Sequence, residues 1–166
     1  MVHSQFIKVA LAALLIGTMS VSAGQKKSSA HHAAKSHHSA KKSTAKKHHI
    51  VVHIDSKDPK IQKVALNNTM ALIRHFGKKN TQVEIVILGA GTAIPMVFSE
   101  TSTYADRLKK MAAMPNIRIS ACNGSMKKFK KRTKKKLTLI KGLHPVPVGV
   151  GRIVELEEQG YSYLHP

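Results

Sequence analysis

The alternation of hydrophobic and polar positions divides the second part of the chain into strands. Residues 49–55 are β-branched and almost continuously apolar, which is typical of a strand buried on both faces. Residues 83–88 repeat this pattern, and residues 117–121 alternate as a short half-buried strand. A further short strand is expected after the proline-containing loop 144–149, and residues 161–164 alternate as a final strand.

Helices are predicted between these strands. Asp58 is suited to cap a helix and Pro59 to occupy its first turn, and an apolar stripe then continues until Gly77 ends the helix. A second helix is expected from about Ser99 to Met114 because apolar residues recur there at helical spacing. A third helix is expected after Asn123, and a fourth ends at Gly160.

This order of elements predicts an α/β fold. Strands that alternate with helices imply right-handed crossovers and a mainly parallel sheet that is covered on both faces. We therefore expect residues 50–166 to form a three-layer α/β/α sandwich of the flavodoxin-like kind, with a mainly parallel five-stranded sheet. The pattern leaves open whether the final strand runs parallel or antiparallel.

The beginning of the chain has the pattern of a targeting signal. A short apolar run, Val9–Ile16, precedes the small residues Val21-Ser22-Ala23, so residues 1–23 are interpreted as a signal peptide cleaved after Ala23. The run is shorter than the ~20 residues of a membrane span, and an uncleaved interfacial anchor is the less favoured alternative. The sequence thus predicts a periplasmic or secreted protein whose mature form has no transmembrane span.

Residues 24–49 are rich in Lys, His, Ser and Ala and are interpreted as a disordered tether. Three histidine pairs, His31-His32, His37-His38 and His48-His49, suggest weak metal binding as a third-ranked function. A solvated basic tether is the favoured interpretation, because these pairs have no accompanying Cys or carboxylate. We therefore assign no metal site and expect no cofactor.

The charge of the chain is strongly positive. It contains 28 Lys and Arg against 8 Asp and Glu, for a formal net charge of +20. Eight of these cations lie within residues 127–136. Such a surface attracts polyanions non-specifically, although the absence of Trp argues against stacking platforms for single-stranded nucleic acid. A solvated helix face is the simpler interpretation of this lysine-rich run.

Cys122 is the only cysteine, and it lies where a strand ends and a helix begins. The positive end of a helix dipole favours the thiolate at such a position. A single cysteine in an exported protein cannot form an internal disulfide. It is therefore an intermolecular bridge, a buried inert residue, or a thiol kept for its reactivity.

The glycines of Gly89-Ala90-Gly91 also follow a strand, as they would in a phosphate-binding loop. The third glycine and the Lys-Ser/Thr pair that would make such a loop specific are missing. A tight turn beside Cys122 is the favoured interpretation.

Several motifs together resemble the DsrE/DsrF-like family over residues 50–166. They are His53-Ile54-Asp55, Asp58-Pro59, Ala65-Leu66-Asn67-Asn68, Val83-Glu84-Ile85-Val86, Ala121-Cys122, Val146-Pro147-Val148-Gly149-Val150 and Glu155-Leu156-Glu157-Glu158-Gln159-Gly160-Tyr161-Ser162-Tyr163. The resemblance implies assembly as a homotrimer or homohexamer and a sulfur carried as a persulfide on the cysteine at the position of Cys122. The loop departs from the family pattern Ala-Cys-x-Asn-Thr-Met, because here it reads Ala121-Cys122-Asn123-Gly124-Ser125-Met126.

Two functional hypotheses follow. In the first, Cys122 accepts sulfane sulfur and passes it to a thiol or sulfur-relay partner protein, as a sulfurtransferase or a sulfur carrier. The amides of Asn123, Gly124 and Ser125 would bind the donor, and Asn68 and His53 are candidate helpers, although a structural role is the favoured interpretation of His53. In the second, the protein is a non-catalytic oligomer that binds anionic partners through its basic surface, and Cys122 is buried and inert.

Overall fold

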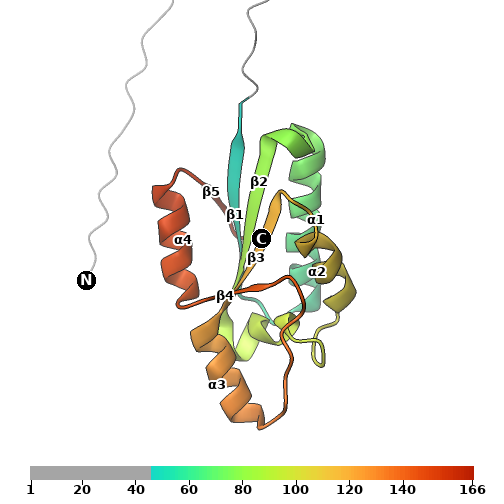
Figure 1. Cartoon of the computed structure of the whole chain (residues 1–166), viewed down its shortest axis with the longest axis vertical. Coiled ribbons are helices and arrows are strands. Elements are labelled where there is room, and N and C mark those ends of the chain that lie inside the picture. The colour runs from blue at the N-terminus through green and yellow to red at the C-terminus, as the bar shows by residue number, and fades with distance from the viewer. Residues whose placement is uncertain (1–45) are drawn as a thin grey trace, which may run out of the picture. The chain divides into compact units, whose positions relative to one another are not determined.

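A computed structural model describes residues 46–166, which form a five-stranded sheet with helices on both faces (Figure 1). The elements in chain order are β1 (His48–Ile54), α1 (Pro59–Phe76), β2 (Thr81–Ile87), α2 (Ala105–Ala112), β3 (Ile117–Cys122), α3 (Asn123–Thr133), β4 (His144–Val146), α4 (Gly149–Glu158) and β5 (Ser162–Leu164). The predicted alternation of strands and helices is therefore confirmed. The signal peptide, residues 1–23, and most of the predicted tether lie outside the described residues.

All neighbouring strands of the sheet are parallel, in the order β4-β3-β2-β1-β5. The final strand, whose direction the sequence left open, pairs parallel to β1. The register places Ile54 beside Ile87 and Ile87 beside Ala121, so the carboxyl ends of β1, β2 and β3 lie level at one edge. This is the three-layer, flavodoxin-like arrangement that the sequence predicts.

The two faces of the sheet are covered differently. Figure 1 shows α1 and α2 on one side of the sheet and α4 on the other. The first side holds the larger apolar cluster, to which β1 contributes Ile50, Val52 and Ile54. The side under α4 holds a small cluster of Val51, Val86, Ile153 and Leu156. Strand alternation explains the division, because successive side chains point to opposite faces.

The first helix begins and ends as the sequence predicts. The Asp58 carboxylate accepts a hydrogen bond from the Lys60 N–H at 2.8 Å, and Pro59 occupies the first turn. Gly77 follows the last turn with a φ of 87°, a conformation that glycine adopts without steric cost. Strand β1 begins at His48, two residues before the predicted start of the domain, so both residues of the last histidine pair belong to the sheet and not to the tether.

The second helix is shorter than predicted. Residues 89–97 form two short helical turns, and α2 begins only at Ala105. The intervening polar residues bond elsewhere, because Glu100 accepts a hydrogen bond from the Thr138 N–H and Thr101 donates to the Pro95 carbonyl. The Glu100 contact anchors the segment to the loop before β4, and the Thr101 contact anchors it to the preceding helical turn, so the segment does not join the helix.

The end of the chain also differs from the prediction in detail. Strand β4 lies within the proline-containing loop rather than after it, and α4 begins directly at Gly149. The early start of α4 matters because it brings the helix N-terminus to the carboxyl edge of the sheet. Among the described residues, no helix is both long and apolar enough to cross a membrane.

Candidate functional site

Cys122 is the last residue of β3 and the residue that precedes the first turn of α3. The chain leaves β3 toward α3 and leaves β4 toward α4, which covers the opposite face from α1 and α2 (Figure 1). Connections that diverge from neighbouring parallel strands open a crevice at their carboxyl ends, where α/β proteins bind ligands. Cys122 and Val146 are paired at this point of the sheet.

A second helix N-terminus reaches the same cysteine. A Cβ atom placed on Gly149, the first residue of α4, would lie 3.0 Å from Cys122 Cβ and 3.0 Å from Leu88 Cβ. Only glycine therefore allows α4 to approach β3 this closely. Cys122 borders the large apolar cluster and faces the start of α4, so two helix dipoles present their positive ends to its sulfur.

The surroundings of the sulfur favour its thiolate form. Burial raises the pKa of Cys122, because only 8% of the residue is exposed. Hydrogen bonds from the Ser125 hydroxyl and from the N–H groups of Ser125, Gly149 and Gly124 outweigh that effect and hold the pKa below the ordinary cysteine value. The arrangement favours the nucleophilic thiolate form of a sulfur that is largely shielded from water.

Ser125 is oriented by the glycine loop that follows β2. Gly89 donates its N–H to Ser125 Oγ at 3.2 Å, which leaves the serine proton available for the sulfur. Gly89 has a φ of 92°, and a side chain there would collide with Thr92. The contact between Gly89 and Ser125 confirms that the glycine loop lies beside the cysteine site, but residues 89–93 form a wide helical turn and not a tight one.

Gly124 leaves a way to the sulfur from solvent. It is exposed, and a Cβ atom at this position would lie 3.9 Å from Cys122 Sγ and 3.9 Å from the Pro147 carbonyl oxygen. A side chain here would cover the thiol, whereas hydrogen does not. The glycine that departs from the family pattern thus coincides with the open side of the site.

A buried charge network, which the sequence reading missed, holds α4 in place. Glu84, the only charged residue of β2, is 3% exposed and receives two hydrogen bonds of 2.8 Å from Arg152 of α4. Ser120 donates to the same carboxylate at 2.6 Å, and Arg152 also pairs with Glu155 at 3.0 Å. These bonds fasten the first turn of α4 above β3 and so fix the Gly149 amide beside Cys122.

The predicted site residues do not all lie together. The loop residues Asn123, Gly124 and Ser125 form the first turn of α3 at Cys122, as expected. Asn68 is not brought to the site, because it lies on α1 beside Leu164 of β5, on the other face of the sheet. Asn68 lies far from Cys122 because two strands, β1 and β2, separate β5 from β3 in the sheet.

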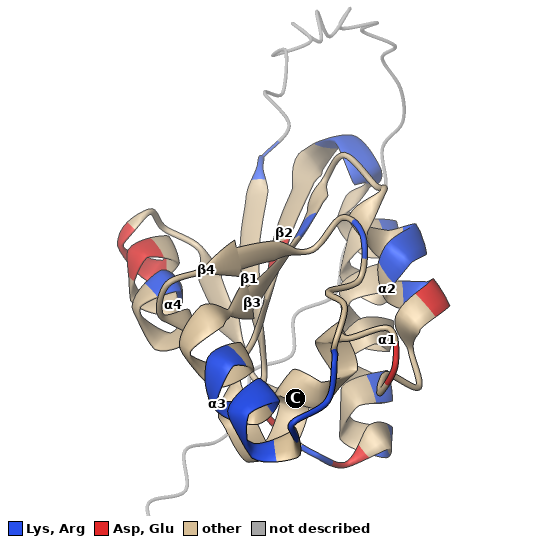
Figure 2. Ribbon diagram, turned by 60° about the horizontal axis from the view of Figure 1, so that its bottom comes forward, with Lys and Arg blue, Asp and Glu red and all other residues tan. Residues whose placement is uncertain are grey.

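The lysine-rich run forms most of α3 and the segment after it (Figure 2). Two of its cations have partners: Lys130 lies over the Phe98 ring, and Arg132 donates to the Ala90 carbonyl at 2.8 Å. The others that are exposed form no ion pair within residues 46–166; they are Lys127, Lys128, Lys131, Lys134, Lys135 and Lys136. Cys122 therefore lies at the N-terminus of a strongly cationic helix.

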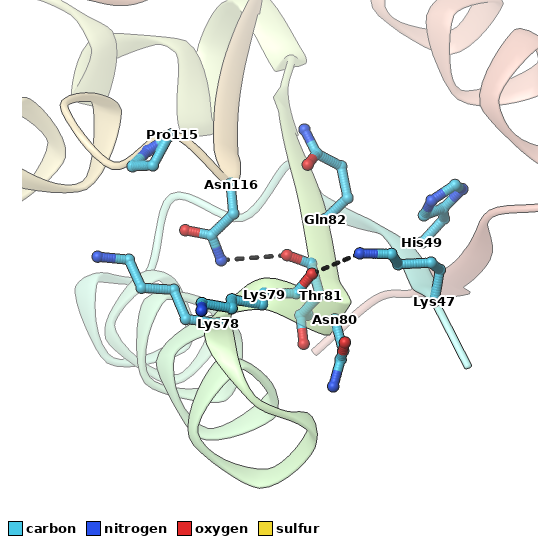
Figure 3. A pocket seen from close by; sticks show the side chains of 9 residues that line it. All are labelled: Lys47, His49, Lys78, Lys79, Asn80, Thr81, Gln82, Pro115 and Asn116. Carbon is cyan, nitrogen blue, oxygen red and sulfur yellow. Dashed lines mark hydrogen bonds between the residues drawn. The ribbon is translucent and has the colours of Figure 1, made fainter. Parts of the chain in front are cut away.

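A separate hollow of about 440 Å³ lies at the amino edge of the sheet (Figure 3). Its lining includes Lys47, Lys78 and Lys79, and Asn116 donates to the Thr81 carbonyl across it at 3.1 Å. Because β3 runs its whole length between this edge and Cys122, the hollow lies roughly 15–20 Å from the sulfur. It takes no part in the chemistry of the cysteine.

The family of the chain follows from its match to a family model. The model of the DsrE/DsrF-like family matches residues 14–166. The protein belongs to the DsrE/DsrF-like family. Membership in the DsrE/DsrF-like family indicates a protein of the sulfur-relay type, with Cys122 as its only cysteine.

A solved structure is similar to this DsrE/DsrF-like chain in fold. It is described as a protein of unknown function, MTH1491 from Methanobacterium thermoautotrophicum, and shares 21% sequence identity with a TM-score of 0.61. The similarity covers 72% of this chain and 99% of the other. No curated protein sequence matches the chain.

Proposed function

We propose that the protein is an exported sulfur carrier, in which Cys122 accepts a sulfane sulfur as a persulfide and passes it to a thiol of a partner protein. The observation that supports this most is the convergence of two helix N-termini and the Ser125 hydroxyl on one thiol. A structural cysteine in a core has no need of four hydrogen-bond donors around its sulfur.

The proposed loading reaction is a thiol exchange without net oxidation. The Cys122 thiolate attacks the terminal sulfur of a persulfide or polysulfide donor, so that an Sγ–S bond forms. The S–S bond of the donor breaks, and the shortened donor leaves with the electron pair as a thiolate. In the transfer step the acceptor thiolate attacks the outer sulfur, and Cys122 leaves as a thiolate. A lowered pKa makes Cys122 a good leaving group in that second step.

The first turns of α3 and α4 are suited to hold the anionic intermediate. A persulfide is itself an anion near neutral pH, and the N–H groups of Gly124, Ser125 and Gly149 are directed at its inner sulfur. The cations of α3 attract an anionic donor toward the opening at Gly124 (Figure 2). The geometry requires no metal or cofactor for this exchange.

Assembly and location are part of the same proposal. Valines on the outer face of α4 and the turn before it are exposed, namely Val148, Val150 and Val154. Their exposure supports the proposal that further copies of the chain cover them, in the homotrimer or homohexamer that the family resemblance implies. Export through the signal-like residues 1–23, to the periplasm or beyond, would bring the thiol to extracytoplasmic sulfur compounds.

The decisive experiment measures the mass of the purified protein after exposure to polysulfide. We expect a gain of one sulfur atom that a reductant reverses and that Cys122→Ser lacks. A Ser125→Ala variant in the same series should load more slowly, because its hydroxyl no longer favours the thiolate. If the wild-type protein gains no sulfur, and its thiol resists alkylation until the fold is melted, the carrier function is wrong.

The basic surface supports a second candidate, the binding of anionic partners without catalysis. The exposed lysines of α3 and the following segment form no ion pair within the described residues, and three acidic residues lie on α4 instead, namely Glu155, Glu157 and Glu158 (Figure 2). Binding to heparin-like or lipid polyanions that falls steeply with salt, and that Cys122→Ser leaves unchanged, would favour this candidate.

A further inference from the structure

Two histidines, an aspartate and a tyrosine meet at the carboxyl ends of β1 and β5. The two strands are parallel, with Val51 beside Tyr163 and Val52 beside Leu164. Side chains alternate along each strand, so His53 and Asp55 share the face of Val51, and His165 shares the face of Tyr163. All four therefore point to the side of the sheet that α4 covers.

The contacts among these side chains leave one nitrogen without a partner. His53 Nδ1 lies 2.8 Å from the Tyr163 hydroxyl, and His165 Nε2 lies 3.0 Å from Asp55 Oδ1. His53 Nε2 is buried, and it has no hydrogen-bond partner within the described residues; Asp55 Oδ2 lies 4.0 Å away. A buried polar atom without a partner is costly, and this one lies near a carboxylate and near a second imidazole, the His165 ring, which is stacked on the His53 ring with centroids 4.6 Å apart.

The hydrogen bond between His53 Nδ1 and Tyr163 leaves Nε2 as the nitrogen that can bind a ligand. When the proton of His53 is on Nδ1, it is donated to the Tyr163 hydroxyl, and the lone pair of Nε2 has no hydrogen-bond donor among the described residues. Histidines that bind metals usually have this arrangement, in which the outer nitrogen donates to a supporting group and the inner nitrogen is the ligand. The supporting bond here comes from the neighbouring strand, so it also fixes the orientation of the ring.

We propose that His53 Nε2, Asp55 and His165 Nε2 form a binding site for a divalent transition-metal ion of the zinc class. Two imidazoles and one carboxylate are a donor set that such ions accept, with a further position left for water or a ligand. The donor atoms lie within 4.8 Å of one another. Tetrahedral zinc requires separations of roughly 3.3 Å between donors, which its ~2.0–2.1 Å ligand distances imply.

The donor atoms can move to these shorter separations, because two of the three side chains are partly exposed. The side chains of Asp55 and His165 are 43% and 45% exposed, whereas that of His53 is 12% exposed. His53 is thus the fixed ligand, held by Tyr163 and by its strand, and the two exposed groups rotate toward it. Binding exchanges the hydrogen bond between Asp55 and His165 for two bonds to the metal.

This site is independent of the proposed sulfur chemistry. Asp55 follows the end of β1, Cys122 ends β3, and β2 with Leu88 lies between them. Two strand spacings put β1 and β3 about 10 Å apart, so Cys122 is not a ligand of the same ion. Loss of metal binding and loss of sulfur loading are therefore separate outcomes.

The test is a competition titration of the full chain with Zn²⁺ against a chelating indicator. His31, His32, His37 and His38 are first replaced by glutamine, so that the histidine-rich segment does not contribute. We expect one tight equivalent of Zn²⁺ and a rise in Tm on its addition. His165→Gln and Asp55→Asn should each weaken that equivalent at least tenfold, and Tyr163→Phe should weaken it by about 10–100-fold through the lost supporting bond.

The matched control is His144→Gln, which removes another exposed histidine at the carboxyl edge but outside the cluster. It should bind Zn²⁺ as the parent does. The two ligand variants remove side chains that are nearly half exposed, and circular dichroism checks that each still folds. The proposal is overturned if the parent binds no tight equivalent, or if His165→Gln and Asp55→Asn bind as tightly as His144→Gln. Unchanged sulfur loading in the ligand variants would confirm that the two sites are separate.

Discussion

The two faces of the sheet serve different purposes. The face under α1 and α2 is apolar from β1 to β3, and its largest buried side chains are aliphatic or aromatic. The face under α4 has only four residues in its apolar cluster, and around them lie the Glu84 network, the His53 cluster and Cys122. One face supplies most of the burial that stabilises the domain, and the other positions polar groups at the carboxyl edge.

The comparison explains why charged groups are buried in so small a domain. A buried ion pair contributes little net stability compared with apolar packing, but its geometry is specific. The bidentate pairing of Arg152 with Glu84 permits one position of α4, whereas aliphatic contacts alone would tolerate sliding. We infer that the network exists to hold the Gly149 amide at Cys122.

The largest expected effect comes from breaking this network. Glu84→Ala leaves Arg152 without its buried partner and should lower the free energy of unfolding by about 3–5 kcal/mol. It should also slow the alkylation of Cys122, because α4 is no longer held at the site. Ile85→Val, one residue along on the apolar face, should cost about 0.5–1.5 kcal/mol and leave the alkylation rate unchanged. Urea unfolding and thiol-labelling kinetics measure both effects.

The same network predicts a dependence of stability on pH. Burial raises the pKa of Glu84, but hydrogen bonds from Arg152 and Ser120 outweigh this and hold the pKa below the ordinary glutamate value. The carboxylate therefore stabilises the fold above its unfolded pKa, and that contribution disappears as the pH falls through the lowered pKa. In Glu84→Ala this acid-dependent loss should be smaller; an identical loss in both proteins would contradict the assignment.

A substitution at Gly149 should test how the packing of α4 against β3 affects Cys122, without removing a charged residue. Gly149→Ala places a Cβ atom 3.0 Å from both Cys122 Cβ and Leu88 Cβ, so α4 must shift. We expect a loss of about 1–3 kcal/mol, typical of overpacking, and a higher pKa for Cys122 as the Gly149 amide moves away. The pH dependence of alkylation measures that pKa. Gly151→Ala serves as the control, because a Cβ atom at this position of the same helix would make only ordinary contacts of 3.7 and 3.9 Å, both with Val148.

Removal of a single hydroxyl should have a smaller effect on the cysteine alone. Ser125→Ala deletes the side-chain hydrogen bond to the sulfur and leaves the Gly89 N–H without its acceptor. The pKa of Cys122 should rise, and the alkylation rate at pH 7 should fall roughly tenfold, the value of one hydrogen bond to a charged group. Ser125→Thr, which retains the hydroxyl, should restore much of the rate. Equal rates in Ser125→Ala and wild type would show that the hydroxyl does not act on the sulfur.

The smallest expected effect concerns how easily reagents reach Cys122, and not the ionisation of its thiol. Gly124 has ordinary backbone angles and an exposed position, so Gly124→Val should fold with a stability change of about 1 kcal/mol or less. Its side chain would cover Cys122 and should slow labelling several-fold for a bulky reagent, with less effect for a small one. A ratio between the two reagents that matches wild type would mean that the thiol is reached from elsewhere.

Much of the architecture was determined by local sequence patterns. The apolar runs of β1 and β2, the Asp58–Pro59 helix start and the Gly77 helix end were all predictable, because each depends on the conformational preferences of a few neighbouring residues. The position of Cys122 between a strand and a helix was predictable for the same reason. The length of α2 was not, because its missing first turns are bound by contacts of Glu100 and Thr101 to other segments.

The chemistry of the site depended on contacts between distant segments. The sequence places Ser125 near Cys122, but only the tertiary structure brings Gly149 to the sulfur and shows that Asn68 lies on the other face. Likewise, His53 and His165 are separated by 112 positions in the chain and meet because β5 returns to pair with β1. Local propensity specifies the elements, whereas the pairing of parallel strands decides which residues share an edge and a face, and a single chain read in order does not reveal that pairing.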